Sequence, residues 1–87
     1  MNFFYLYVRM PTVLLIQGFR FFFFSADRVE PIHVHVKRGD GDGKIWLTPS
    51  VKPAYLVGFT SQEEKRILEI ATENRELIIA KWHEYFE

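Results

Sequence analysis

The chain has 87 residues, enough for one domain, and 48% of them are hydrophobic, including nine Phe. This composition is typical of a globular protein and excludes a disordered chain. The eleven basic and eleven acidic residues cancel, so the net charge favours neither a strongly cationic nucleic-acid-binding protein nor an acidic nucleic-acid mimic.

Cysteine is absent, which excludes disulfides, thiolate metal ligands and Cys nucleophiles and fits a cytoplasmic location. No apolar run approaches the ~18 residues of a membrane span, so no membrane partner is expected. Residues 1–10 are apolar but lack the charged start and the small-residue cleavage site of a signal peptide.

The first half of the chain predicts strands. Residues 12–16 are rich in β-branched side chains and end at Gln17-Gly18, and residues 19–26 form a second candidate strand. Both faces of this second strand are apolar, so it needs cover on both sides; the two faces are Phe19, Phe21, Phe23 and Arg20, Phe22, Phe24. Residues 27–31 read as a loop.

Residues 32–37 alternate strictly, with Ile32, Val34 and Val36 on one face and His33, His35 and Lys37 on the other. A glycine-rich turn follows at residues 39–43. If Asp40-Gly41 is the two-residue turn of a hairpin, apolar residues pair consistently on one face. The expected pairs are Val36 with Ile45, Val34 with Leu47, His35 with Trp46 and His33 with Thr48.

Residues 49–54 predict a turn or a sheet edge, and residues 55–57 a last short strand. A helix begins after Thr60 or Ser61, with Glu63 or Glu64 completing a capping box. One helix of ~26 residues would be ~39 Å long, which is long for this domain, so a break near Asn74 stays open.

At 100° per residue, the helical segment carries one main apolar stripe, which predicts the face packed on the sheet: Ile67, Leu68, Ala71, Ile78, Trp82, Tyr85, Phe86. Ile70 and Leu77 form a second, narrower stripe. This stripe either widens the core face or contacts a partner, because one helix cannot cover both faces of a Phe-rich sheet. The terminal segment reads as a core anchor through Trp82 and Phe86, and the alternative is recognition by an exposed His83 and Glu84.

The sequence therefore predicts a single α+β domain over residues 1–87: a β-rich part at 10–58 and a helical part at 60–87. The expected fold is a small, mostly antiparallel sheet of four or five strands with one long C-terminal helix packed on one face. Residues 1–9 read as an N-terminal extension, and residues 3–8 as an added edge strand or as cover for the Phe-rich face.

His33 and His35 are the main candidates for chemistry, because residues two apart on a strand point to the same side. Three interpretations stay open. The pair lines the polar side of the strand, with His35 stacked on Trp46. Alternatively, both imidazoles bind a divalent metal, with a third ligand from His83, Glu30, Asp42 or another chain. In the third, they perform acid–base or phosphate chemistry with Lys37 and Arg20, as in a metal-free ribonuclease. An intramolecular carboxylate is the expected partner of Arg20.

Several segments resemble the bacterial family called domain of unknown function 4160, over residues 10–87. The resemblance lies in Met10-Pro11-Thr12-Val13-Leu14, Gly18-Phe19-Arg20-Phe21-Phe22-Phe23-Phe24-Ser25, Glu30-Pro31-Ile32-His33-Val34-His35-Val36, Gly58-Phe59-Thr60, Glu73-Asn74-Arg75-Glu76-Leu77 and Trp82-His83-Glu84-Tyr85-Phe86. The Pro-x-His-Val-His-Val stretch resembles the family's hallmark, although the family usually has a second Pro where this chain has Ile32.

The resemblance implies a small bacterial protein without an established activity, whose gene often lies beside that of another small domain, as in toxin–antitoxin pairs. The leading hypothesis is a non-enzymatic module that binds a protein partner or forms a homodimer, without a cofactor. The partner-binding residues expected for it are Phe22, Phe24, Trp46, Ile70, Leu77 and His83. The alternative is a small ribonuclease-like or metal-dependent enzyme that uses His33 and His35, assisted by Arg20. Nucleic acid is not the favoured partner, because a nucleic-acid enzyme usually has a basic surface.

Overall fold

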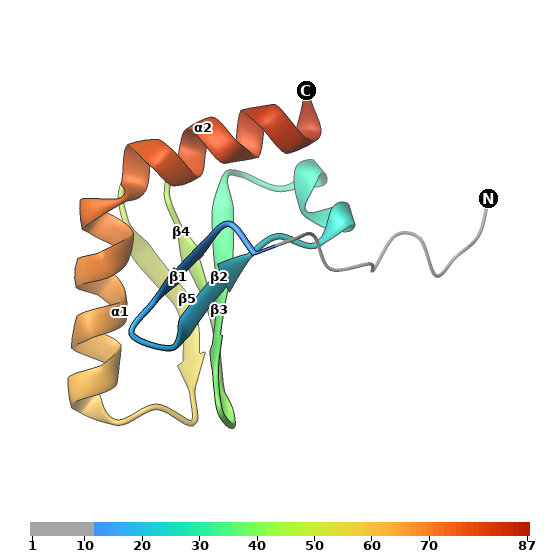
Figure 1. The fold of residues 1–87 in the computed structure, drawn as a ribbon. Helices are drawn as coiled ribbons and strands as arrows, with labels where there is room; N and C mark the ends of the chain where they lie inside the picture. The colour runs from blue at the N-terminus through green and yellow to red at the C-terminus, as the bar shows by residue number, and fades with distance from the viewer. Residues whose placement is uncertain (1–11) are drawn as a thin grey trace.

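A computed structural model describes residues 12–87 (Figure 1). The extension expected at residues 1–9, and the strand or cover expected at 3–8, lie outside the described residues. In the described part, five strands form one antiparallel sheet in chain order, so each strand pairs with the next. They are β1 (Leu14–Ile16), β2 (Phe19–Phe22), β3 (His33–Arg38), β4 (Gly41–Trp46) and β5 (Lys52–Val57). The α+β class and the antiparallel sheet are confirmed.

The turn between β1 and β2 is the expected one. Gln17 and Gly18 have φ of 54° and 81°, and Ile16 pairs with Phe19 across them. Two successive residues with positive φ are the signature of a type I′ turn, whose twist matches the flanking strands. The Gln17-Gly18 pair therefore sets the start of the sheet.

The hairpin of β3 and β4 keeps the predicted faces but not the predicted register. Arg38 pairs with Gly41, so the turn is Gly39-Asp40 and not Asp40-Gly41. Gly39 has φ of 56°, which suits the first central position of a tight hairpin turn. The pairing shifts by two residues: Val34 faces Ile45, Val36 faces Gly43, and Trp46 faces His33 instead of His35. A shift of two preserves which side each residue faces.

The Phe-rich second strand is shorter than the expected 19–26. It ends at Phe22, and a 3₁₀ helix, η2 (Ser25–Val29), occupies much of the predicted loop. Asp27 stabilises the first turn of this helix, because its Oδ2 accepts the Phe24 N–H at 2.7 Å and its own N–H donates to the Phe24 carbonyl at 3.0 Å. The turn brings η2 over the outer side of the sheet, where Phe22 is buried.

The helical half consists of two helices, α1 (Ser61–Glu73) and α2 (Arg75–Phe86), which corrects the expected single helix. Asn74 is the break: its side chain donates to the Ile70 carbonyl at 2.9 Å, as does its backbone N–H at 3.0 Å. Arg75 Nε donates to the Leu47 carbonyl at 2.8 Å, which ties the start of α2 to the end of β4. Figure 1 shows α1 beside the sheet and α2 across one of its ends.

The core lies between the helices and the inner face of the sheet. Its fully buried members are Phe21, Phe23, Val34, Val36, Ile45, Leu47, Ile67, Ile70, Ala71 and Ile78. Ile70, expected on a separate stripe with Leu77, is therefore a core residue, whereas Leu77 is 44% exposed. The interpretation that the second stripe widens the core face is confirmed for Ile70. The break at Asn74 lets two shorter helices together cover the inner face of the sheet.

The last strand, β5, lies at the sheet edge and starts earlier than the predicted 55–57. Pro53 is tolerated there because an edge strand has one unpaired side. Thr60 is the N-cap of α1 and forms the capping box with Glu63. Within the described residues, no helix is long and apolar enough to cross a membrane.

Candidate functional site

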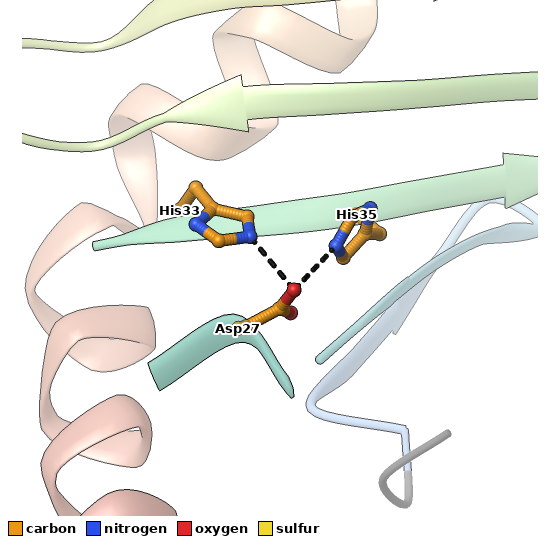
Figure 2. Close-up of side chains that lie close together, drawn as sticks. All are labelled: Asp27, His33 and His35. Carbon is orange, nitrogen blue, oxygen red and sulfur yellow. Dashed lines mark hydrogen bonds and ion pairs between the residues drawn. The ribbon is translucent and has the colours of Figure 1, made fainter. Parts of the chain in front are cut away.

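His33 and His35 project from the outer side of β3 towards a carboxylate of η2. Figure 2 shows the two imidazoles meeting at Asp27. Asp27 Oδ1 lies 3.0 Å from His33 Nε2 and 3.1 Å from His35 Nε2. Alternation along β3 puts both histidines on one face, and the capped turn at Phe24 holds the carboxylate above them. The result is a buried Asp–His–His cluster.

The cluster is closed to large molecules. His33 is 0%, Asp27 6% and His35 7% exposed. Aromatic rings surround the imidazoles: Trp46 and Trp82 lie 5.3 and 5.4 Å from the His33 ring, and Phe22 and Phe24 lie 5.6 and 4.7 Å from the His35 ring. His35 therefore stacks on Phe22 and not on Trp46, as the two-residue register shift requires.

Asp27 is an anion in this setting. Burial raises the pKa of its carboxyl group, but the imidazoles of His33 and His35 and the Phe24 N–H stabilise the carboxylate more strongly. The net result holds the pKa of Asp27 far below its usual range. The cluster thus presents one carboxylate and two imidazoles, three groups of the types that bind divalent metals.

Asp27 was missing from the sequence-based set of third ligands. The signal for it is a short polar residue just after a strand, where Asp side chains cap turns. The three residues that the sequence offered as a third ligand instead have other neighbours. Glu30 accepts from Lys44 Nζ at 2.6 Å, Asp42 faces Lys37 across the hairpin, and exposed His83 pairs with Glu87. Lys44 also lowers the pKa of Glu30 through this hydrogen bond.

A second candidate surface is the part of the outer face that η2 leaves open. One row of cross-strand neighbours runs over all five strands: Leu15, Arg20, Lys37, Asp42 and Val57. Leu15 and Val57 are 63% and 58% exposed. A shallow hollow of about 350 Å³ lies beside this row, lined in part by Leu15, Arg20 and Lys37.

Arg20 lacks its expected carboxylate partner. Neither Arg20 nor Lys37 forms an ion pair within residues 12–87, although they are direct cross-strand partners. Like charges directly opposite each other destabilise a sheet. Arg20 shares the outer face with His35 but lies beside Lys37, in the row next to the histidine, so it does not join the Asp–His–His cluster.

The residues expected to bind a partner are dispersed. Phe22 and Ile70 are buried, which contradicts the expected exposure of these side chains. Phe24 and Trp46 are half-buried around the histidines, and Lys44 Nζ lies 4.5 Å from the Trp46 ring. Leu77 and His83 are exposed on α2. They share no surface row with Arg20 and Lys37.

Comparison with known proteins gives one result. The family model described as Domain of unknown function (DUF4160) matches residues 18–83. The chain belongs to this family. The match includes both histidines, Asp27 and the two helices up to His83, and it is narrower than the resemblance expected over residues 10–87. No curated protein and no solved structure matches the chain.

Proposed function

We propose that this domain of the DUF4160 family is a non-enzymatic binding module whose open sheet face binds an acidic protein partner. The observation that carries this is the row Leu15–Arg20–Lys37–Asp42–Val57, in which exposed apolar side chains flank two adjacent cations. Neither cation forms an ion pair within residues 12–87, although Asp42 is the cross-strand neighbour of Lys37. Carboxylates of a partner would remove the repulsion between Arg20 and Lys37 while covering Leu15 and Val57.

Burial of the histidines argues against the enzymatic alternative. A ribonuclease must bring a ribose and its phosphate within hydrogen-bond reach of its acid and base. His33 is completely buried, and η2 and the aromatic rings cover His35. A macromolecular substrate cannot reach either imidazole in this arrangement.

The family resemblance supplies a candidate partner. We infer that the protein is bacterial and cytoplasmic and that the neighbouring gene of a toxin–antitoxin-like pair encodes the acidic partner. The test is calorimetric titration of the purified neighbour product into the wild type and into the double variant Arg20→Gln/Lys37→Gln. Two lost surface ion pairs predict about tenfold weaker binding.

Lys65→Gln/Lys81→Gln is the matched control, since it removes two cations from the helices. It should bind like the wild type. Equal affinity of the two double variants contradicts the proposed surface. Two further measurements test other occupants of the open face: sedimentation over a range of concentrations for a homodimer, and a gel-shift with single-stranded RNA. If the wild type forms a dimer or an RNA complex and Arg20→Gln/Lys37→Gln does not, the face binds that occupant and not an acidic protein partner.

A further inference from the structure

His33 carries a proton on the nitrogen that faces away from Asp27. Its Nδ1 lies 2.8 Å from the Pro31 carbonyl oxygen, which can only accept, so Nδ1 is the donor. In the neutral imidazole, Nε2 then has a bare lone pair. This atom is completely buried and faces Asp27 Oδ1 at 3.0 Å.

With His33 neutral, two acceptors thus face each other in a buried site, and His33 stabilises the Asp27 carboxylate only when a cation lies at Nε2. A lone pair and a carboxylate oxygen repel at this distance unless a cation lies between them. A proton on Nε2 is one such cation, but the contact does not have the alignment of a hydrogen bond, and His33 Nε2 has no hydrogen-bond partner within residues 12–87. This geometry suits a cation that lies to one side of the line between His33 Nε2 and Asp27 Oδ1.

We propose that Asp27 Oδ1, His33 Nε2 and His35 Nε2 bind one divalent transition-metal ion such as Zn²⁺, a site distinct from the open face that carries the proposed function. Tetrahedral ligands bonded at about 2.1 Å stand about 3.4 Å apart, with each lone pair aimed at the ion and not at the other ligand. The separations of 3.0 and 3.1 Å between Oδ1 and the two nitrogens come within a few tenths of an ångström of this spacing.

The three donor atoms lie within 4.8 Å of one another. Tetrahedral coordination needs the two nitrogens about 3.4 Å apart, so the two imidazoles approach each other when the ion binds. Water then supplies the fourth ligand.

The surroundings of the ligands support the same assignment. Histidine ligands commonly donate their other ring N–H to a backbone carbonyl, as His33 does to Pro31. The Phe24 N–H holds the second oxygen of the Asp27 carboxylate at 2.7 Å, which orients Oδ1 towards the nitrogens. The side chains of His35 and Asp27 retain 9% and 8% exposure, an opening suited to an ion but not to a larger ligand.

The test uses the full 87-residue chain, free of any histidine tag and treated with a chelator, with Zn²⁺ and Co²⁺ as probes and Mg²⁺ as the negative probe. Titration should give one Zn²⁺ per chain and a visible Co²⁺ spectrum that Zn²⁺ removes. At about 100 times Kd, Zn²⁺ should raise Tm by about 10 °C. Mg²⁺ should do neither, because imidazole is a poor ligand for it.

Asp27→Asn is the isosteric variant, and it should weaken Zn²⁺ binding by at least about 100-fold, more than loss of an outer hydrogen bond to a ligand usually does. His35→Ala should do the same, whereas His83→Ala, which removes the exposed histidine of α2, should leave binding unchanged. Loss of binding in His83→Ala, or unchanged binding in Asp27→Asn and His35→Ala, contradicts the site.

Imidazole nitrogen NMR of the wild type decides the question even if a variant fails to fold. On Zn²⁺ loading, His33 should keep Nδ1–H while its Nε2 signal shifts to that of a metal-bound nitrogen. A His33 with protons on both nitrogens at neutral pH and no response to Zn²⁺ overturns the proposal. Neither result tests the open face, so the proposed metal site and the proposed partner-binding face can be disproved independently.

Discussion

At the scale of single residues, Asp27 joins two parts of the molecule that the sequence alone keeps apart. Its Oδ2 forms the turn after β2, and its Oδ1 meets both histidines of β3. The alternation along 32–37 predicts that the histidines share a face, but no periodicity predicts which carboxylate they meet. That depends on a five-residue 3₁₀ helix, η2, which occupies the end of the expected strand and much of the expected loop.

Ile70 and Leu77 test the packing of the helices residue by residue. Ile70→Ala should lower the free energy of unfolding by about 3 kcal/mol, because it leaves a cavity in the core. Leu77→Ala should change it by less than about 1 kcal/mol, because this side chain is half exposed. Urea unfolding followed by Trp fluorescence measures both, and equal effects would place the two residues on one stripe, against the fold described above.

At the scale of elements, the sequence predicted the start of α1, whereas it left the break near Asn74 only as an open alternative to one long helix. Thr60 and Glu63 form a capping box that three residues of sequence specify, since both hydrogen bonds are local. The break at Asn74 instead depends on Arg75 reaching the Leu47 carbonyl, a contact between distant parts of the chain. Local chemistry therefore predicts a helix start better than a helix break.

The capping box makes the stability of α1 depend on pH. The hydrogen bond that the Glu63 carboxylate accepts from the Thr60 N–H holds the pKa of Glu63 below its usual value of 4.5, and the Thr60 hydroxyl and Arg38 add to the effect. Because the folded pKa is lower than the unfolded one, the contribution is present above pH 4.5 and is lost as the pH falls through the folded pKa. Glu63→Gln should be less stable than the wild type at pH 7, and this difference should shrink in acid.

Glu64→Gln is the control for this pH dependence, because it removes a charge from the same helical turn without touching the capping box. Its stability should follow that of the wild type over the acid range. Thermal unfolding between pH 7 and pH 3 compares the three proteins. A constant difference between Glu63→Gln and the wild type at every pH would show that the carboxylate is not the group involved.

At the scale of the whole molecule, the sheet and the direction of its faces followed from alternation and from glycine-containing turns. The register of β3 and β4 did not, because Gly39-Asp40 and Asp40-Gly41 are both good turn pairs and both keep Val34, Val36 and Ile45 on one side. The expectation of an uncovered Phe face also failed at Phe22, which is buried and packs on the rings of Phe24 and His35. The alternation of residues along a strand does not predict which distant segment of the chain buries each face of the sheet.

The zero net charge hides an uneven distribution. Residues 12–57 have six Lys or Arg and four Asp or Glu, whereas residues 58–87 have four and seven. The β-rich half is therefore cationic and the helical half anionic. On the open face, the cations Arg20 and Lys37 stand beside each other with one carboxylate, Asp42, next to Lys37, so the local charge that an approaching acidic surface meets is positive despite the neutral whole.

Salt should therefore weaken partner binding at the open face. The attraction between exposed charges is screened over about 10 Å at 0.1 M salt and about 3 Å at 1 M, so Kd should rise steadily between these concentrations. Because the slope reflects the charges that meet in the complex, it should be shallower for Arg20→Gln/Lys37→Gln and unchanged for Lys65→Gln/Lys81→Gln. Titrations at four salt concentrations give the three slopes, and an equal slope for the first variant and the wild type would place the contact away from this face.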